Sequence, residues 1–462
     1  MDNGKMDRRQ FLVCAAAATT AATAMAGAKG AKGKNAAKAA EDAAKEPLPP
    51  LIASAPVLQN AAETSMGVSF AVSADASGWV EYSRSPDMKD AKRAYSGGCG
   101  LMDVNPSVAL VRLTGLAPAT KYYYRIGADR ISYKGGYKMK NLGPERDAKV
   151  HSFTTLGAAA TGSFCVINDT HARKPALGAV LAKVRELNPA VVLWNGDASN
   201  TSETIETAME VFIHTHPDHP EYASDTPYMF VRGNHDFRGR FNRRLGDLMM
   251  LREPAERSGE FAELGRNFVQ RLGDIALIGL DTGEDKLDDD PRFAGLFRMK
   301  EYRELQARWL AEVVETEAVR TARHKVAFCH IPLFDPNPRL NPGDVSVHSP
   351  EAKKYSPDFA GWQRGCARLW GPSLAKAGVK LVIAAHQHQF RHDPPDAGRP
   401  WAQIVGGGPD MDPAKGNLYP TVIHGRSENG ELRVTVYNVR DGVVVFDSVI
   451  GDGNPGSVGS FA

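Results

Sequence analysis

At 462 residues the chain is longer than one hydrophobic core usually serves, which predicts two domains plus a terminal extension. Its hydrophobic share of 42% is ordinary for a globular protein, and a formal net charge of +2 is too small to predict a nucleic-acid scaffold as a partner. Five cysteines without a C-x-x-C pair exclude a disulfide framework.

The first 26 residues predict an export signal. Arg8 and Arg9 precede Phe11-Leu12 and a weakly apolar run that ends in Ala24-Met25-Ala26. This order resembles a twin-arginine signal peptide cleaved after Ala26, which implies a periplasmic or secreted protein and the twin-arginine translocase as its partner during export. The run is too short for stable membrane insertion. Residues 27–49, rich in Ala, Lys and Gly, predict a flexible linker.

Residues 50–157 predict an all-β sandwich, because short alternating runs are separated by turn residues. Residues 113–125 read Leu-Thr-Gly-Leu-Ala-Pro-Ala-Thr-Lys-Tyr-Tyr-Tyr-Arg. This phrase is similar to the strand–turn–strand of the fibronectin III-like modules that precede purple acid phosphatase-type catalytic domains. The segment holds no catalytic cluster, so a scaffold role is favoured, and binding of carbohydrate or a cell surface stays open.

Residues 163–450 predict an α/β domain. Apolar strand-like runs alternate with helical segments such as Pro175 to Leu187, which predicts a sheet covered on both faces. The runs are 164–167, 190–194, 228–231, 275–280, 326–328 and 379–384. Three later runs, near 421–424, 432–437 and 443–449, predict antiparallel strands that complete a second sheet.

Five runs end in residues that bind metals. They are Asn168-Asp169-Thr170-His171, Asn195-Gly196-Asp197, Arg232-Gly233-Asn234-His235-Asp236, Cys329-His330 and Ala385-His386-Gln387-His388. Ligands gather at the carboxyl ends of strands, so we expect these residues to converge in one cleft at the edge of one sheet. Mixed imidazole and carboxylate ligands suit Fe, Zn or Mn. Two such ions can hold a bridging hydroxide and clamp the oxygens of a phosphate ester.

The series Asp-x-His, Gly-Asp, Gly-Asn-His-Asp, His and His-x-His resembles the calcineurin-like metallophosphoesterase superfamily. The resemblance implies a four-layer αββα sandwich of two mixed β-sheets flanked by helices, two metal ions and hydrolysis of a small-molecule phosphate ester. It also implies roles for nine residues. Asp169, His171 and His388 hold the first metal, Asn234, His330 and His386 the second, Asp197 bridges both, His235 protonates the leaving oxygen or steadies the phosphate, and Asp236 orients His235.

Two positions depart from purple acid phosphatases. Those enzymes resemble Gly-Asp-x-x-Tyr at the second motif, where this chain has Asn200, and they lack the histidine that this chain has at His171. The resemblance therefore implies a metal centre of the general metallophosphoesterase type, without the purple colour.

Several alternatives stay open. A phosphomonoesterase of broad range leads, and the same metals also suit a phosphodiesterase acting on nucleotides or lipid head groups. An inactive binding protein is disfavoured because every ligand position is filled. His214, His216 and His219 form either a third metal site or a solvated loop. Arg173, Arg232 and Arg238 contact either the substrate phosphate or structural acids, and a tight turn is favoured for the glycines 406–408.

Overall fold

The computed structural model describes residues 48–251, 259–286, 288, 290–336 and 357–451, with side chains of the last range from residue 365. From residue 50 onward the described chain belongs to one compact unit. The predicted export signal and all but the last two residues of the predicted linker lie outside the described residues. No helix in the described ranges combines the length and apolar character that crossing a bilayer demands.

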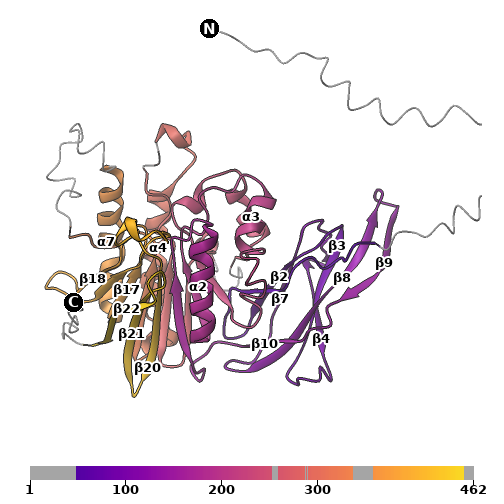
Figure 1. The fold of residues 1–462 in the computed structure, drawn as a ribbon, viewed down its shortest axis with the longest axis horizontal. Coiled ribbons are helices and arrows are strands. Elements are labelled where there is room, and N and C mark those ends of the chain that lie inside the picture. The colour runs from indigo at the N-terminus through magenta and orange to yellow at the C-terminus, as the bar shows by residue number, and fades with distance from the viewer. Residues whose placement is uncertain (1–47, 252–258, 287, 289, 337–356, 452–462) are drawn as a thin grey trace, which may run out of the picture. The chain divides into compact units, whose positions relative to one another are not determined.

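The amino-terminal strands form a two-sheet sandwich (Figure 1). One sheet has the order β10-β8-β3-β4 with β9 paired to β8, and it packs on β1, β2 and β7. Phe70 and Tyr124 are fully buried between the sheets. The strands are β1 (Val57–Gln59), β2 (Met66–Ala71), β3 (Ala76–Ser83), β4 (Lys92–Tyr95), β5 (Gly97–Gly98), β6 (Leu101–Met102), β7 (Val108–Leu113), β8 (Lys121–Tyr133), β9 (Met139–Arg146) and β10 (His151–Thr154).

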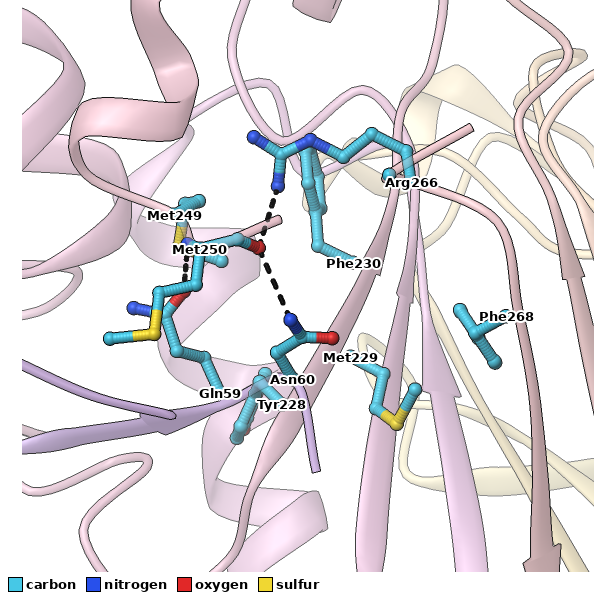
Figure 2. A pocket seen from close by; sticks show the side chains of 10 residues that line it. Gln59, Asn60, Tyr228, Met229, Phe230, Met249, Met250, Arg266 and Phe268 are labelled. Carbon is cyan, nitrogen blue, oxygen red and sulfur yellow. Dashed lines mark hydrogen bonds between the residues drawn. The ribbon is translucent and has the colours of Figure 1, made fainter. Parts of the chain in front are cut away.

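The sandwich shares a sheet with the α/β domain. Strand β1 pairs in parallel with β13 (Tyr228–Val231), so the order β22-β21-β20-β11-β12-β13-β1-β2-β7 runs through nine strands. Figure 2 shows the junction, where the Met250 amide donates to Gln59 Oε1 at 2.7 Å, and Asn60 and Arg266 donate to the Met250 carbonyl. This continuity was not predicted, because the sequence does not show which edges pair.

The α/β domain has four layers, as predicted. The first sheet is covered by α2 (Lys174–Leu187) and α3 (Ile205–Phe212), and the second by α4 (Met299–Val313) and α7 (Pro357–Ala377). The other strands of the first sheet are β11 (Ser163–Ile167), β12 (Val191–Asn195), β20 (Thr421–Glu428), β21 (Glu431–Asn438) and β22 (Val443–Ile450). The second sheet, β14-β15-β16-β17-β19-β18, contains β14 (Phe268–Leu272), β15 (Ile275–Leu280), β16 (His324–Cys329), β17 (Leu381–Ala384), β18 (Arg391–Asp393) and β19 (Ala402–Val405).

Short helices fill the connections. They are α5 (Glu317–Arg320) and the 3-10 helices η1 (His235–Phe237), η2 (Phe241–Asp247), η4 (Gly259–Glu263), η5 (Pro291–Phe293) and η7 (Pro413–Lys415).

Alternation along the strands explains why they read as continuous apolar runs. In β11, Phe164 and Val166 belong to the core between the sheets, whereas Cys165 and Ile167 pack toward α2 and α3. Phe164 meets Phe328 of the second sheet edge to face, with ring centroids 5.6 Å apart. Because both faces of a central strand such as β11 are buried, no polar face remains to mark the period of two.

Two details of the predicted topology are wrong. The five motif strands belong to two facing sheets, since β11, β12 and β13 lie in the first and β16 and β17 in the second. The late strands β20–β22 do not build the second sheet. They extend the first, because β20 pairs antiparallel with β11 from Ser163↔Arg426 to Val166↔Ile423. Strand pairing joins distant segments, so local patterns do not reveal it.

Candidate metal centre

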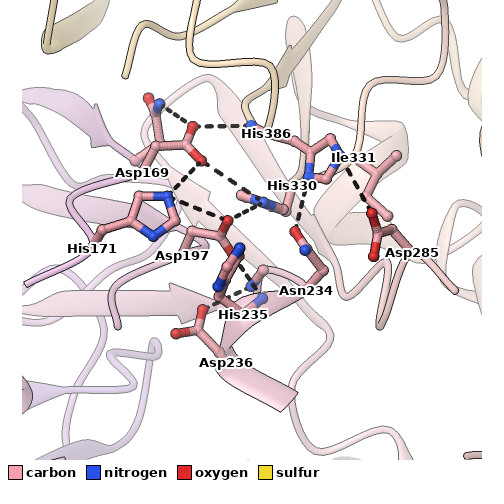
Figure 3. Close-up of polar contacts among 12 residues, drawn as sticks. Asp169, His171, Asp197, Asn234, His235, Asp236, Asp285, His330, Ile331 and His386 are labelled. Atoms are coloured by element: carbon pink, nitrogen blue, oxygen red, sulfur yellow. Dashed lines mark hydrogen bonds and ion pairs between the residues drawn. The ribbon is translucent and has the colours of Figure 1, made fainter. Parts of the chain in front are cut away.

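The predicted ligands meet where the two sheets present the carboxyl ends of their strands (Figure 3). Two groups of side chains place one donor atom each within 4.8 Å of one another, and they share Asp197. The first group is Asp169, His171, Asp197 and His388, and the second is Asp197, His330 and His386. Asn234 joins the second group, since its Oδ1 lies 2.8 Å from His386 Nδ1.

Each buried carboxylate has one oxygen held by the protein and one facing the histidines. Asp169 Oδ2 accepts hydrogen bonds from the Asn168 amide group at 2.8 Å and the His386 backbone at 2.9 Å. Asp197 Oδ1 accepts one from the His235 backbone at 2.9 Å. The other oxygens, Asp169 Oδ1 and Asp197 Oδ2, are therefore free to bind a cation.

These two oxygens lie close to the histidine nitrogens that face them, and His171 Nε2 lies 2.9 Å from His388 Nε2. Asp197 Oδ2 lies 3.3 Å from His330 Nε2 and 3.6 Å from His171 Nε2, and Asp169 Oδ1 lies 3.4 Å from His388 Nε2. Asp169 Oδ1 and His330 Nε2 are buried and have no hydrogen-bond partner. Buried polar atoms are almost always paired. These donor atoms therefore fit metal ions. A mixture of oxygen and imidazole ligands suits Fe, Zn or Mn.

The backbone at the ligands is strained. Asp169, His171, Asp197, His386 and His388 all have positive φ, between 46° and 70°. Non-glycine residues avoid this left-handed region, and such strain concentrates at functional sites. Each sharp turn lies directly after or within a few residues of a strand end, so it directs consecutive side chains into the centre.

Neighbouring groups fix which nitrogen of each histidine faces the centre. His330 Nδ1 lies 2.9 Å from the Asn195 carbonyl, and His171 Nδ1 lies 2.8 Å from Asn200 Oδ1. Because Nδ1 donates in both contacts, Nε2 keeps its lone pair for a metal. No sequence pattern indicated this use of Asn195, and Asn200 stood out only as a departure from a tyrosine pattern.

Electrostatics draw positive charge into the centre. Burial raises the pKa values of Asp169 and Asp197, but the attraction of His388 and His330, respectively, outweighs burial and holds both pKa values below the usual range. Burial lowers the pKa of His330, yet Asp197 overcomes this and raises it to about 10. Burial and repulsion by His330 lower the pKa of His386 to about 4. The two carboxylates are thus ionised, which favours a cation beside them.

His235 borders the cluster without belonging to either group of donors. Its ring packs edge to face on His171, with centroids 4.9 Å apart, and its Nδ1 lies 3.2 Å from the Asn200 carbonyl. Arg238 Nη1 lies 3.1 Å from His235 Nε2, and the same guanidinium pairs with Glu284 at 3.0 Å and Asp285 at 3.2 Å. In this position the imidazole of His235 can act on a molecule bound to the metals.

The predicted role of Asp236 in orienting the His235 side chain is wrong. The carboxylate of Asp236 accepts hydrogen bonds from the Gly233 amide at 2.8 Å and the Ser199 amide at 3.2 Å, and neither of its oxygens bonds the imidazole. Burial and repulsion by Asp197 raise the pKa of Asp236 to about 7. The 3-10 turn at residues 235–237 directs the Asp236 side chain away from the imidazole and toward the loops that carry Ser199 and Gly233. Asp236 therefore ties the second motif loop to the third.

Glycines allow the motif loops to approach one another. A Cβ on Gly233 would lie 2.2 Å from Asp197 Oδ1, and a Cβ on Gly196 would lie 2.3 Å from His330 Nδ1. A Cβ on Gly406 would lie 2.0 Å from Asn168 Oδ1, and one on Gly408 2.5 Å from His388 Cβ. Residues 406–408 thus form the packed wall behind the first group of ligands, where only glycine fits.

The remaining candidates mostly pair with protein groups. Arg232 forms an ion pair with Asp281 at 2.6 Å, and Arg173 lies 3.4 Å from Asp410 on the surface. Within the described ranges, the only groups of three or more possible ligands are the two at the centre. His214, His216 and His219 do not form such a set, so the structure favours the solvated-loop alternative for this segment over a third metal site. Asp285, whose Oδ2 lies 3.9 Å from His386 Nε2, had no sequence signal.

Two family models match the chain. Residues 162–390 match the model described as calcineurin-like phosphoesterase, and residues 55–155 match the purple acid phosphatase N-terminal domain. The catalytic domain of the chain belongs to the calcineurin-like phosphoesterases. The enzyme is accordingly a metal-dependent phosphatase by family, and the centre described above is compatible with two metal ions.

Solved structures share the fold of this phosphoesterase. A purple acid phosphatase from seeds of yellow lupin (Lupinus luteus) has a TM-score of 0.57 and 14% identity, over 85% of this chain and 73% of that one. The structure of PhoD has a TM-score of 0.53 and 12% identity, over 87% of this chain and 92% of that one. The phosphoesterase has no match among curated proteins. Identities this low show a common fold alone.

Proposed function

We propose that the phosphoesterase is an exported phosphomonoesterase with a dinuclear metal centre. The observation that carries the proposal is the pair of donor groups that share Asp197, each with unsatisfied atoms facing inward. We take a phosphate monoester as the substrate because the lupin enzyme with this fold is a phosphatase, and the comparison of esters below tests that choice.

Asp169, His171 and His388 would hold one ion, Asn234, His330 and His386 the other, and Asp197 both. Two such ions, when bound, neutralise phosphoryl oxygens and activate water as a nucleophile. Residues around the metal ligands have the remaining roles. Asn195 and Asn200 hold the rings of His330 and His171 in place. His235, held by Arg238 and the Asn200 carbonyl, is placed to give a proton to the leaving oxygen or to bind the phosphate.

Export is part of the proposal, and its support comes from the sequence. Arg8 and Arg9, followed by Phe11-Leu12, have the order of a twin-arginine signal. That route carries folded proteins, which suits an enzyme that takes up its metals before it leaves the cytoplasm. Cys99, Cys165, Cys329 and Cys366 are all free thiols. The described fold therefore needs no oxidising compartment to form.

The test pairs metal analysis with a panel of esters. Protein purified after native export should contain about two Fe, Zn or Mn ions per chain. It should hydrolyse p-nitrophenyl phosphate much faster than bis-p-nitrophenyl phosphate, and chelation should abolish both activities. Faster turnover of the bis ester would instead make the enzyme a phosphodiesterase. Hydrolysis that survives exhaustive chelation would contradict the metal mechanism. An Arg8→Lys, Arg9→Lys variant should remain in the cytoplasm with its activity intact.

A further inference from the structure

The outer end of the β8–β9 hairpin is exposed over ten consecutive residues, 133–142. It carries four large apolar side chains. Their exposed fractions are 53% for Tyr133, 106% for Tyr137, 56% for Met139 and 49% for Leu142. Single exposed apolar residues are common, but a cluster on one short segment indicates a contact surface. In Figure 1 this end of β8 and β9 stands clear of the coloured elements around it.

The same hairpin is strongly cationic. Residues 130–144 contain Arg130, Lys134, Lys138 and Lys140 and no acidic residue. The acids at its base are partly engaged elsewhere, since Glu145 accepts hydrogen bonds from the Leu51 and Ile52 amides. With a net charge of only +2 on the whole chain, this segment is a local concentration of positive charge.

Beyond a register shift between Asp129 and Ile131, the two strands of the hairpin pair up to the turn and present these side chains. Tyr133 pairs with Met139 and Ser132 with Lys140 across the two strands. The turn is closed by the Lys138 amide, which donates to the Gly135 carbonyl at 2.8 Å, and by the Lys134 amide, which donates to the Lys138 carbonyl at 3.1 Å. Directly paired residues lie on the same face of the two strands, so Tyr133 and Met139 are neighbours on one face of the hairpin.

The charge and the apolar side chains of the hairpin indicate which kind of partner it would bind. A second copy of the hairpin would bring eight like charges together, which is unfavourable. A soluble acidic polymer would use the cations but leave Tyr137, Met139 and Leu142 in water. A membrane with anionic lipids would engage both the cations and the apolar side chains of the hairpin. Its charged headgroups attract the basic residues, and apolar and aromatic side chains enter the interface between headgroups and acyl chains.

We propose that the β8–β9 hairpin, residues 130–144, docks the phosphoesterase onto membranes that contain anionic lipids. Four cations supply the attraction, and the Tyr133, Tyr137, Met139 and Leu142 side chains enter the interface. The proposal does not depend on the metals or on the ester that is hydrolysed. It gives the sandwich domain a function as a peripheral membrane anchor.

Vesicle sedimentation of the full mature chain tests the proposal. The protein should pellet with phosphatidylcholine vesicles that contain phosphatidylglycerol, and not with phosphatidylcholine alone. Changing Lys134, Lys138 and Lys140 together to Gln should weaken this binding by at least about tenfold. The matched control changes three exposed lysines of the α/β domain, Lys300, Lys376 and Lys415, to Gln. That variant should bind like wild type, and all variants should keep wild-type phosphatase activity.

A second pair of measurements separates the lipid from other partners. Tyr137→Ser with Met139→Ser should also weaken vesicle binding, and Tyr137→Trp should show a blue shift of its fluorescence with anionic vesicles. The proposal is overturned if wild type does not pellet, if the control triple variant loses binding equally, or if the apolar variant binds unchanged. Equal binding to soluble alginate, or dimerisation that the hairpin variants abolish, would assign the surface to a polymer or to a second copy and would overturn it too.

Discussion

The sandwich domain and the metal centre differ in what they bury. The sandwich places apolar side chains such as Phe70 and Tyr124 in its core. The centre instead buries Asp169, Asp197 and His330, leaves Asp169 Oδ1 and His330 Nε2 without hydrogen bonds, and holds Asp169 and Asp197 at positive φ. Burial of charge and strain both cost stability. A folded protein keeps such features where they serve a function, so the concentration of buried charged groups marks the centre as the candidate active site.

The largest effect is expected from Asp197→Ala. It removes the one carboxylate that both groups of donors share, so kcat should fall by at least about a thousandfold. Metal analysis should show loss of bound ions. The matched change in the sandwich domain is Asp103→Ala at an exposed position, which should alter neither value. A variant without Asp197 that kept two ions and its activity would contradict the assignment.

His235→Ala should keep both ions and lower kcat by about a hundredfold or more, the usual contribution of a positioned proton donor. Turnover and metal content are measured on the same preparation. His151→Ala is the control, since that buried histidine of the sandwich lies 3.7 Å from Asp225 and belongs to neither donor group. It should lower the melting temperature and leave kcat unchanged. If His235→Ala emptied the centre, His235 would be a ligand instead.

Gly233→Ala should lower kcat/KM by about a hundredfold, because a Cβ 2.2 Å from Asp197 Oδ1 displaces that carboxylate. Gly98→Ala is its counterpart in the sandwich, where an added Cβ meets nothing within 4 Å. Steady-state kinetics of the two variants would show how much more an added Cβ disturbs activity at the metal centre than in the sandwich. Equal kinetics would mean that the loops at the centre relax freely.

The smallest effect is expected from Asn200→Ala. Losing the hydrogen bond to His171 Nδ1 should weaken binding of the first metal by about tenfold to a hundredfold, as other partners of metal-binding histidines do. Competition with a chelator gives the affinity. Asn105→Ala removes a side chain that caps the Ser107 and Val108 amides of the sandwich. It should lower the free energy of unfolding by about 1 kcal/mol without changing metal affinity. An Asn200 variant with unchanged affinity would show that His171 is held by packing alone.

The sequence by itself determined the donor residues and the kind of fold. Asp169, His171, Asp197, His330 and the two histidines of His-x-His follow apolar runs directly, and strand ends are where parallel sheets collect ligands. The helix predicted from Pro175 to Leu187 forms as α2, because its apolar residues recur at helical spacing. These features depend on neighbours within a few residues.

Only the tertiary structure decided how the segments pair. It divided the motif strands between two sheets, attached β20 to β11 and continued the catalytic sheet into the sandwich through β1 and β13. It also turned Asp236 away from the His235 ring and brought Asn200 to His171. Apolar runs show that a strand is buried, but they do not show which strand lies beside it. That choice depends on packing between residues far apart in the chain.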